Sequence, residues 1–88
     1  MPAKYMELDL GTRVVFPEGY DCYPHFLFKE RLEGQVVSLH DHYVAVRLDV
    51  VKEELEEWDN CIHAYCEDWG KEEVPDSVLE IPGLEVLH

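Results

Sequence analysis

Basic residues are scarce in this chain: 7 Lys and Arg stand against 20 Asp and Glu, which gives a formal net charge of −13 over 88 residues. Such a balance repels a phosphate backbone unless cations are gathered locally, so we expect no direct nucleic-acid binding. Apolar runs are short, since none approaches the roughly 18 residues of a membrane span. The opening MPAKYMELDLG has neither the charged nor the apolar region of a signal peptide. These features predict a cytoplasmic protein without membrane contact.

Catalytic motifs are also missing. The 5 glycines are scattered singly, so the chain has no glycine-rich loop of the kind that cradles phosphates. No nucleophile elbow is present, and the 20 carboxylates single out no acid–base pair. The 3 cysteines, Cys22, Cys61 and Cys66, are odd in number and come without an export signal, which predicts reduced thiols. We therefore expect a protein that is not an enzyme and needs no cofactor.

What the chain does contain is enough apolar side chain for one core. Apolar residues make up 47% of the sequence, too many for a disordered tail, and 88 residues leave no room for a second core. Residues 1–88 are therefore expected to form a single domain. The negative charge is concentrated in the second half, where residues 45–88 hold 13 acidic and 3 basic side chains.

Short β-branched and aromatic runs between turn residues predict strands over 12–16, 35–39, 43–48, 61–65 and 78–81. The tripeptide 40–42 gives the second and third runs hairpin spacing. Gly34 is expected to mark a bulge or tight bend. Within 43–48, the residues Val44, Val46 and Leu48 share one face, and we expect that face to point into the core.

A helical period replaces the strand period after Asp49. The apolar residues Val51, Leu55, Trp58 and Ile62 recur at i, i+4, i+7 and i+11 with glutamates between them, which predicts a short helix or helical turn. Four to five short antiparallel strands with one short helical insert indicate a mainly β fold, and we predict a small SH3-like barrel.

Several motifs occur in a recognisable order: G-x-R-V-V-F at 11–16, Y-P-H-F at 23–26, E-E-W-D-N-C-I-H at 56–63 and a closing L-E-V-L. From Gly11 to Leu87 this order resembles a family of uncharacterised small proteins, common in phage and environmental bacterial sequences, that look like SH3-like barrels. The resemblance implies that fold and a phage or mobile-element origin, but no activity. The chain departs from the family pattern at 29–33, where charged residues replace a turn rich in Pro, Gly and Ala.

One set of residues combines rings that can stack with polar groups that can orient a ligand, as small-molecule sites do. Its members are Tyr23, His25, Phe26, Arg47, Trp58, Asp59, Asn60 and His63. Arg47 is included because a nucleotide phosphate would need a cation. The alternative is that the rings belong to the core and that Asp59-Asn60 only ends a helix.

A metal site is a further alternative, because Cys22-x2-His25 and Cys61-x-His63-x2-Cys66 offer five ligands for zinc if their segments meet. On a strand, however, Cys61 and His63 share one face and Cys66 projects to the other. Buried free cysteine is also common as a small hydrophobe. We expect the fold to form without metal and keep a structural metal-binding domain as the third function.

Two functions rank ahead of it. The first is a non-enzymatic binding protein of phage or mobile-element type, an anti-defence inhibitor in the host cytoplasm whose acidic face occupies a basic surface of a host protein. Its partner-binding residues are Glu53, Glu54, Glu56 and Glu57. The second is a small-ligand binder that sequesters a nucleotide signal in an aromatic and histidine pocket, with a homo-oligomer interface as one place for that pocket.

Overall fold

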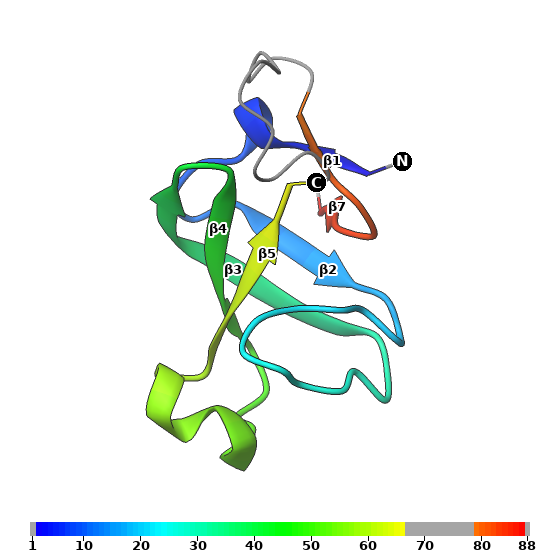
Figure 1. Cartoon of the computed structure of the whole chain (residues 1–88), viewed down its shortest axis with the longest axis vertical. Coiled ribbons are helices and arrows are strands. Elements are labelled where there is room, and N and C mark those ends of the chain that lie inside the picture. The colour runs from blue at the N-terminus through cyan, green and yellow to red at the C-terminus, as the bar shows by residue number, and fades with distance from the viewer. Residues whose placement is uncertain (1, 67–78, 88) are drawn as a thin grey trace.

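The computed structural model describes residues 2–66 and 79–87 (Figure 1). Seven strands and two 3-10 helices follow one another in these residues: β1 Ala3–Lys4, η1 Tyr5–Glu7, β2 Arg13–Phe16, β3 Leu32–His40, β4 Tyr43–Leu48, η2 Glu53–Trp58, β5 Cys61–Tyr65, β6 Glu80–Ile81 and β7 Glu85–Val86. The protein is thus a small, mainly β domain, as predicted. Among the described residues, no helix is long and apolar enough to cross a membrane.

All strand pairs are antiparallel. The larger sheet has five strands in the order β5-β4-β3-β2-β7, and β1 pairs with β6 in a separate two-stranded sheet. The last strand, β7, therefore returns to lie beside β2 (Figure 1). Within the described residues β5 and β7 remain the two edges of the larger sheet, so no closed barrel is formed there.

The predicted strands 43–48 and 61–65 are confirmed residue for residue by β4 and β5. The run 12–16 corresponds to β2, and the run 35–39 is the middle of the longer β3. Of the predicted strand 78–81, Glu80–Ile81 forms β6, and residue 78 lies outside the described residues. The two-residue strands β1 and β7 were not predicted.

Strand β3 changes the face that its side chains occupy half-way along its length. Val36 pairs with Val46, but the next pair is Ser38 with Ala45, so Val37 is an extra residue in a β-bulge. Without this bulge, Ser38 and His40 would share the core face with Val36, because side chains alternate along a strand. The bulge turns both side chains to the outer face of the sheet.

Gly34 is not the bulge that we predicted. A Cβ atom built at this position would lie 2.6 Å from the Arg47 carbonyl oxygen and 2.7 Å from Cγ1 of Val46. The glycine is therefore needed because β3 and β4 approach each other closely, which is the other common reason for glycine in a strand interior.

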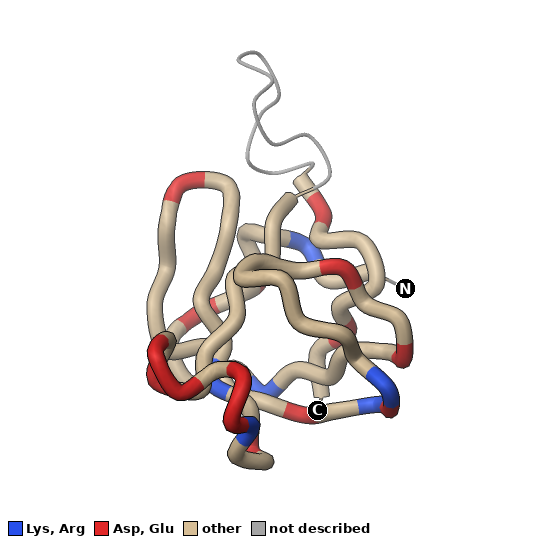
Figure 2. The backbone as a smooth tube through the Cα atoms, turned by 60° about the horizontal axis from the view of Figure 1, so that its bottom comes forward, with Lys and Arg blue, Asp and Glu red and all other residues tan. Residues whose placement is uncertain are grey.

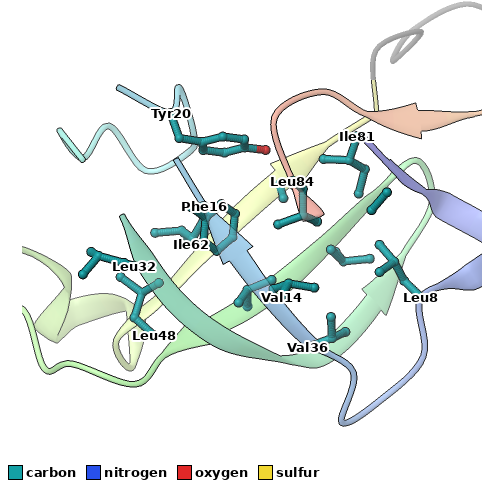
Figure 3. Packing of buried hydrophobic residues seen from close by; sticks show 14 of the residues in the cluster. Leu8, Val14, Phe16, Tyr20, Leu32, Val36, Leu48, Ile62, Ile81 and Leu84 are labelled. Atoms are coloured by element: carbon teal, nitrogen blue, oxygen red, sulfur yellow. The ribbon is translucent and has the colours of Figure 1, made fainter. Parts of the chain in front are cut away.

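The core lies on the inner face of the larger sheet (Figure 3). Val44, Val46 and Leu48 of β4 are 0%, 0% and 3% exposed, so the predicted core face is confirmed. The long segment between β2 and β3 adds a second layer of rings, in which Phe16 lies 4.8 Å from Tyr20 and 5.1 Å from Phe28 between ring centroids. Offset and edge-on ring pairs of this kind stabilise a core beyond the area they bury.

The predicted helical stripe is only partly right. The segment 53–58 is a 3-10 helix, in which side chains repeat every three residues instead of 3.6. Leu55 is buried at 1% exposure, but Val51 is 82% exposed and Trp58 is 37% exposed. Asp59 and Asn60 end the helix with φ angles of 56° and 59°, in the left-handed region that Asp and Asn tolerate best.

Candidate binding surface

Six aromatic and imidazole rings gather outside the core, and we refer to them as the ring surface. They come from the β2–β3 segment, β3, β4, η2 and β5, and are Tyr23, His40, Tyr43, Trp58, His63 and Tyr65. Tyr23 is 51% exposed and Trp58 37%, while the other four are half-buried. The result is a continuous, largely uncharged patch bounded by strand and loop backbone.

His63 lies at the centre of the ring surface. Its ring centroid is 5.0 Å from that of Tyr43, 5.8 Å from Tyr23, 6.0 Å from Trp58 and 6.3 Å from both His40 and Tyr65. Burial, with a smaller contribution from nearby His40, holds the pKa of His63 below its ordinary value. The central imidazole is therefore neutral near physiological pH.

Backbone hydrogen bonds bring the β2–β3 segment onto this surface. The amide of His63 donates to the Tyr23 carbonyl oxygen at 2.5 Å, and the amide of Tyr23 donates to the His63 carbonyl oxygen at 3.3 Å. This isolated bridge lies on the edge of β5 that has no neighbouring strand. It places the Tyr23 ring edge-on to Trp58, at 5.4 Å and 84°.

The cross-strand pairs of β3, β4 and β5 place the remaining rings. His40 pairs with Tyr43, and the two rings stack at 4.5 Å with an interplanar angle of 5°. Tyr43 also pairs with Tyr65 across β4 and β5, at 5.0 Å. The small Ala45, paired with His63, is buried and leaves room for the rings around it. His40 reaches this face only because of the bulge at Val37.

The structure brings together three of the residues predicted to bind a ligand: Tyr23, Trp58 and His63. Phe26 does not join them, because it is 6% exposed and packs in the core 5.0 Å from Phe28. His25 is exposed and takes no part in the ring contacts of the described residues. The Tyr-Pro-His-Phe motif thus contributes one ring to the surface and one to the core.

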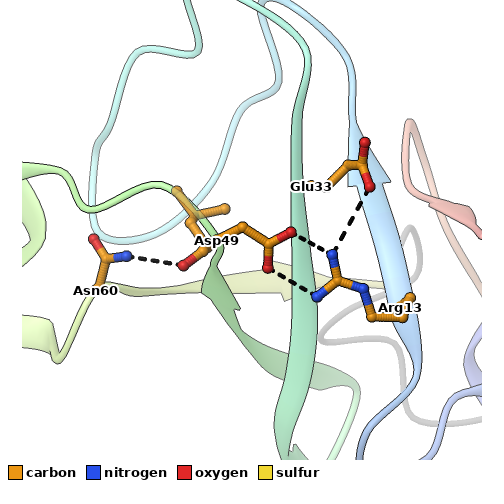
Figure 4. A network of polar contacts seen from close by, with 5 residues as sticks. Arg13, Glu33, Asp49 and Asn60 are labelled. Carbon is orange, nitrogen blue, oxygen red and sulfur yellow. Dashed lines mark hydrogen bonds and ion pairs between the residues drawn. The ribbon is translucent and has the colours of Figure 1, made fainter.

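The polar members of the predicted set hold the η2 loop. Arg47 bonds Asp59 through Nη2 and Oδ2 at 2.5 Å, and its Nε donates to the Asp59 carbonyl oxygen at 3.4 Å. At the other end of the loop, Arg13 pairs with both carboxylate oxygens of Asp49 (Figure 4). Arg13 lowers the pKa of that carboxyl group. These ion pairs position η2, and with it Trp58.

Asn60 completes this support from inside the loop. Its Nδ2 donates to the carbonyl oxygens of Leu48 at 3.0 Å and Val50 at 3.1 Å, and its Oδ1 accepts from the amide of Lys52 at 2.8 Å. One of the two Nδ2 bonds is drawn in Figure 4. All these partners are backbone groups of the chain itself. The Asn60 side chain therefore helps to orient the loop that carries Trp58.

Replacing Asn60 by alanine should lower the free energy of unfolding by roughly 2–3 kcal/mol, because three backbone groups lose a partner and alanine tolerates a positive φ poorly. Asp59→Ala is the matched control, since it removes a side chain at a similar φ but breaks only an exposed ion pair. Chemical denaturation of both variants measures the difference. Equal destabilisation would show that the Asn60 hydrogen bonds contribute little.

The cysteines and histidines of the alternative metal site do not come together. Among the described residues, which include all three cysteines, no group of three or more His, Cys, Asp or Glu side chains is placed to hold a metal ion. Burial raises the pKa of the Cys22 thiol to about 11 and raises that of Cys61. Thiols held in the protonated form are poor metal ligands and poor nucleophiles.

The acidic residues of η2 adjoin the ring surface along the chain. Glu53, Glu54, Glu56 and Glu57 are all exposed and lie in η2 just before Trp58. Acidic positions are red on the backbone in Figure 2. At the β3–β4 turn, next to His40, the exposed Asp41 is also acidic. Charge on these two flanking segments is therefore negative.

Three members of the ring surface, His40, Tyr43 and Tyr65, were not among the predicted site residues. Tyr43 and Tyr65 could have been found, because each alternates with core residues on a predicted strand and so must face outward. His40 gives no such signal, since its direction depends on the bulge.

Comparison with known proteins adds no relative: no protein-family model, curated protein or solved structure matches the chain. The resemblance to phage-associated small proteins stays a prediction.

Proposed function

We propose that this chain is a non-enzymatic binding protein that docks a basic protein partner on the ring surface and on the acidic side chains of η2. The observation that carries the proposal is the junction of the two at Trp58, where exposed aromatic rings meet four exposed glutamates, two on each side of the buried Leu55. Inhibition of a host defence or regulatory protein by a phage or mobile element is the biological setting that we infer.

Charge and ring chemistry both favour a basic partner. Lys and Arg side chains are attracted to the faces of Trp and Tyr rings, and carboxylates around an interface steer cationic partners and select against acidic ones. Exposed rings such as Tyr23 and Trp58 are also the residue types that contribute most to protein interfaces. A net charge of −13 extends this attraction beyond the contact area.

A nucleotide pocket finds less support. Arg47, the cation expected to meet a phosphate, is ion-paired with Asp59. Tyr23, Trp58 and His63 pack against one another with centroids 5.4–6.0 Å apart, so a planar base would lie on the rings and not between them. The metal alternative also lacks support, because the described residues contain no group of three or more His, Cys, Asp or Glu side chains placed to hold a metal ion.

We also propose the finer description of the fold, an SH3-like barrel that is open in the described residues. Supporting it are the five-stranded antiparallel sheet, the bulge in β3, and the pairing of the last strand, β7, with β2. The fold alone carries no function.

Site-specific photo-crosslinking tests the proposed function. A benzophenone amino acid in place of Tyr23 should capture the partner in the producing cells, and that partner should be a protein with a basic surface. Reversal of Glu53, Glu54, Glu56 and Glu57 to Lys should then weaken binding of the purified partner at least about tenfold at low salt, with less effect at high salt.

The control carries the same change in net charge elsewhere, with Lys at Glu7, Asp9, Glu80 and Glu85, none of which belongs to η2 or to its ion pairs in the described residues. Both variants should keep the circular dichroism spectrum and melting transition of the native protein, since none of these side chains is buried. A captured partner with an acidic surface, or equal binding by the two variants, would refute the proposal.

A further inference from the structure

A hollow of about 410 Å³ opens beside the ring surface, where the end of β5 meets the start of the β2–β3 segment and the β6–β7 turn. Its size lies in the range of small-molecule sites, roughly 300–1,000 Å³. The residues that shape it are Pro17, Glu18, Tyr20, Asp21, Tyr65 and Pro82.

The walls of the hollow are apolar and ring-bearing. Pro17 and Pro82 lie on its rim, and the Tyr20 ring lies against Gly83, where an added Cβ would be only 3.1 Å from Cδ1 of that ring. Tyr20 packs into the core beneath, 4.8 Å from Phe16 (Figure 3). Burial raises the pKa of the Tyr20 hydroxyl, so that group stays neutral. The hollow is thus backed by a packed core.

The charged side chains that line the hollow are both acidic. Glu18 and Asp21 are exposed, and no basic residue lines this hollow within the described part of the chain. An adjoining hollow of about 280 Å³ shares Pro17 and Gly83 with this one, and there Arg31 is accompanied by the acidic Glu85. Apolar walls with two carboxylates at the mouth suit a side chain that has an apolar stem and a cationic head.

We propose that this hollow binds an arginine side chain of the basic partner. The methylene stem of arginine would lie along the prolines and Tyr65, and its planar guanidinium would stack on a ring and hydrogen-bond to Glu18 or Asp21. Arginine fits better than lysine because its planar, weakly hydrated head group both stacks and bonds carboxylates in pairs.

Tyr65 connects the hollow to the ring surface. Its ring lines the hollow and lies 5.0 Å from Tyr43 and 6.3 Å from His63. An arginine anchored here would therefore sit at one end of the ring surface, with η2 and Trp58 at the other. This inference rests on the proposed function only for the identity of the protein that supplies the arginine, and the hollow can be tested without that protein.

The test is a titration of the ¹⁵N-labelled protein with a blocked tetra-arginine peptide, followed by NMR. We expect saturable shifts of the Gly19, Tyr20 and Gly83 amides, and nuclear Overhauser contacts between arginine methylenes and the rings of Tyr20 and Tyr65. Glu18→Gln with Asp21→Asn should raise the dissociation constant at least about fivefold, as two exposed charge pairs allow.

Glu7→Gln with Asp9→Asn is the matched control, because it removes the same charge from exposed residues outside the hollow and should change the dissociation constant less than about twofold. Shifts confined to η2, or equal weakening by the two double variants, would overturn the arginine site and leave the proposed function standing. The opposite result is also informative: the peptide shifts the amides around the hollow, while charge reversal in η2 leaves partner binding unchanged. That result would overturn the proposed docking face and leave the arginine site standing.

Discussion

Val46→Asp should leave the chain unfolded. Val46 is 0% exposed, and it lies in β4 between β3 and β5, paired with Val36 on one side and Ile62 on the other. A carboxylate there would meet only apolar side chains, and burial of a polar group without a hydrogen bond costs several kcal/mol. A domain of this size is stable by roughly 4–13 kcal/mol in total, so the penalty removes most or all of the margin.

Val51→Asp is the control for this prediction, since it makes the same chemical change at a valine that is 82% exposed. It should fold and melt within a few degrees of the native protein. Circular dichroism melts and NMR dispersion of the two variants give the comparison. A cooperatively melting Val46→Asp protein would mean that the β4 side chains are assigned to the wrong faces.

The same two valines show how far the sequence predicts this fold. Alternation along a strand is a strong signal, so the faces of β4 and β5 could be predicted from residues 43–48 and 61–65 alone. Val51 was assigned to a helical stripe because its spacing to Leu55 fits an α-helix. The segment is instead a 3-10 turn held by Asn60 and by ion pairs with β2 and β4, contacts distant in sequence that no local period reveals.

The short strands escaped prediction for a different reason. β1 and β7 have two residues each, which is too few for any periodicity, and their pairing partners β6 and β2 lie far away in the chain. These two strands are determined by their long-range pairing with β6 and β2, and not by a pattern in their own residues.

The sequence predicted only some of the rings of the candidate surface, since the predicted Phe26 packs in the core and Tyr43 and Tyr65 were not predicted. Tyr23, Trp58 and His63 lie together, and their role in ligand binding stays a prediction. Arg47 and Asn60 have the right chemistry for a site, but their hydrogen-bonding groups are used within the η2 loop. A sequence shows which side chains can donate or accept hydrogen bonds, but not which of these groups form hydrogen bonds within the folded chain.

Among the described glycines, replacement by alanine should lower the free energy of unfolding most at Gly34. The new Cβ would lie 2.6 Å from the Arg47 carbonyl oxygen, and that oxygen belongs to the backbone of β4, which is held between β3 and β5. Neither a rotamer change nor a flexible side chain can relieve this contact, so the two central strands must separate locally. We expect a loss of about 3 kcal/mol, at the upper end of the range for overpacking.

That loss corresponds to a melting temperature lower by roughly 12–24 °C for a domain of this length. Gly19→Ala is the control that separates the steric clash at position 34 from the backbone cost of replacing a glycine. Gly19 has a φ of 80° but nothing within 4 Å of an added Cβ, so this variant bears only the backbone strain, about 1 kcal/mol. If the two variants melt at the same temperature, β3 and β4 can accommodate the added methyl group, and the expected steric clash at position 34 is refuted. If Gly34→Ala alone drops sharply, the close approach of β3 and β4 at this glycine contributes to the stability of the sheet beside the Val36–Val46 pair.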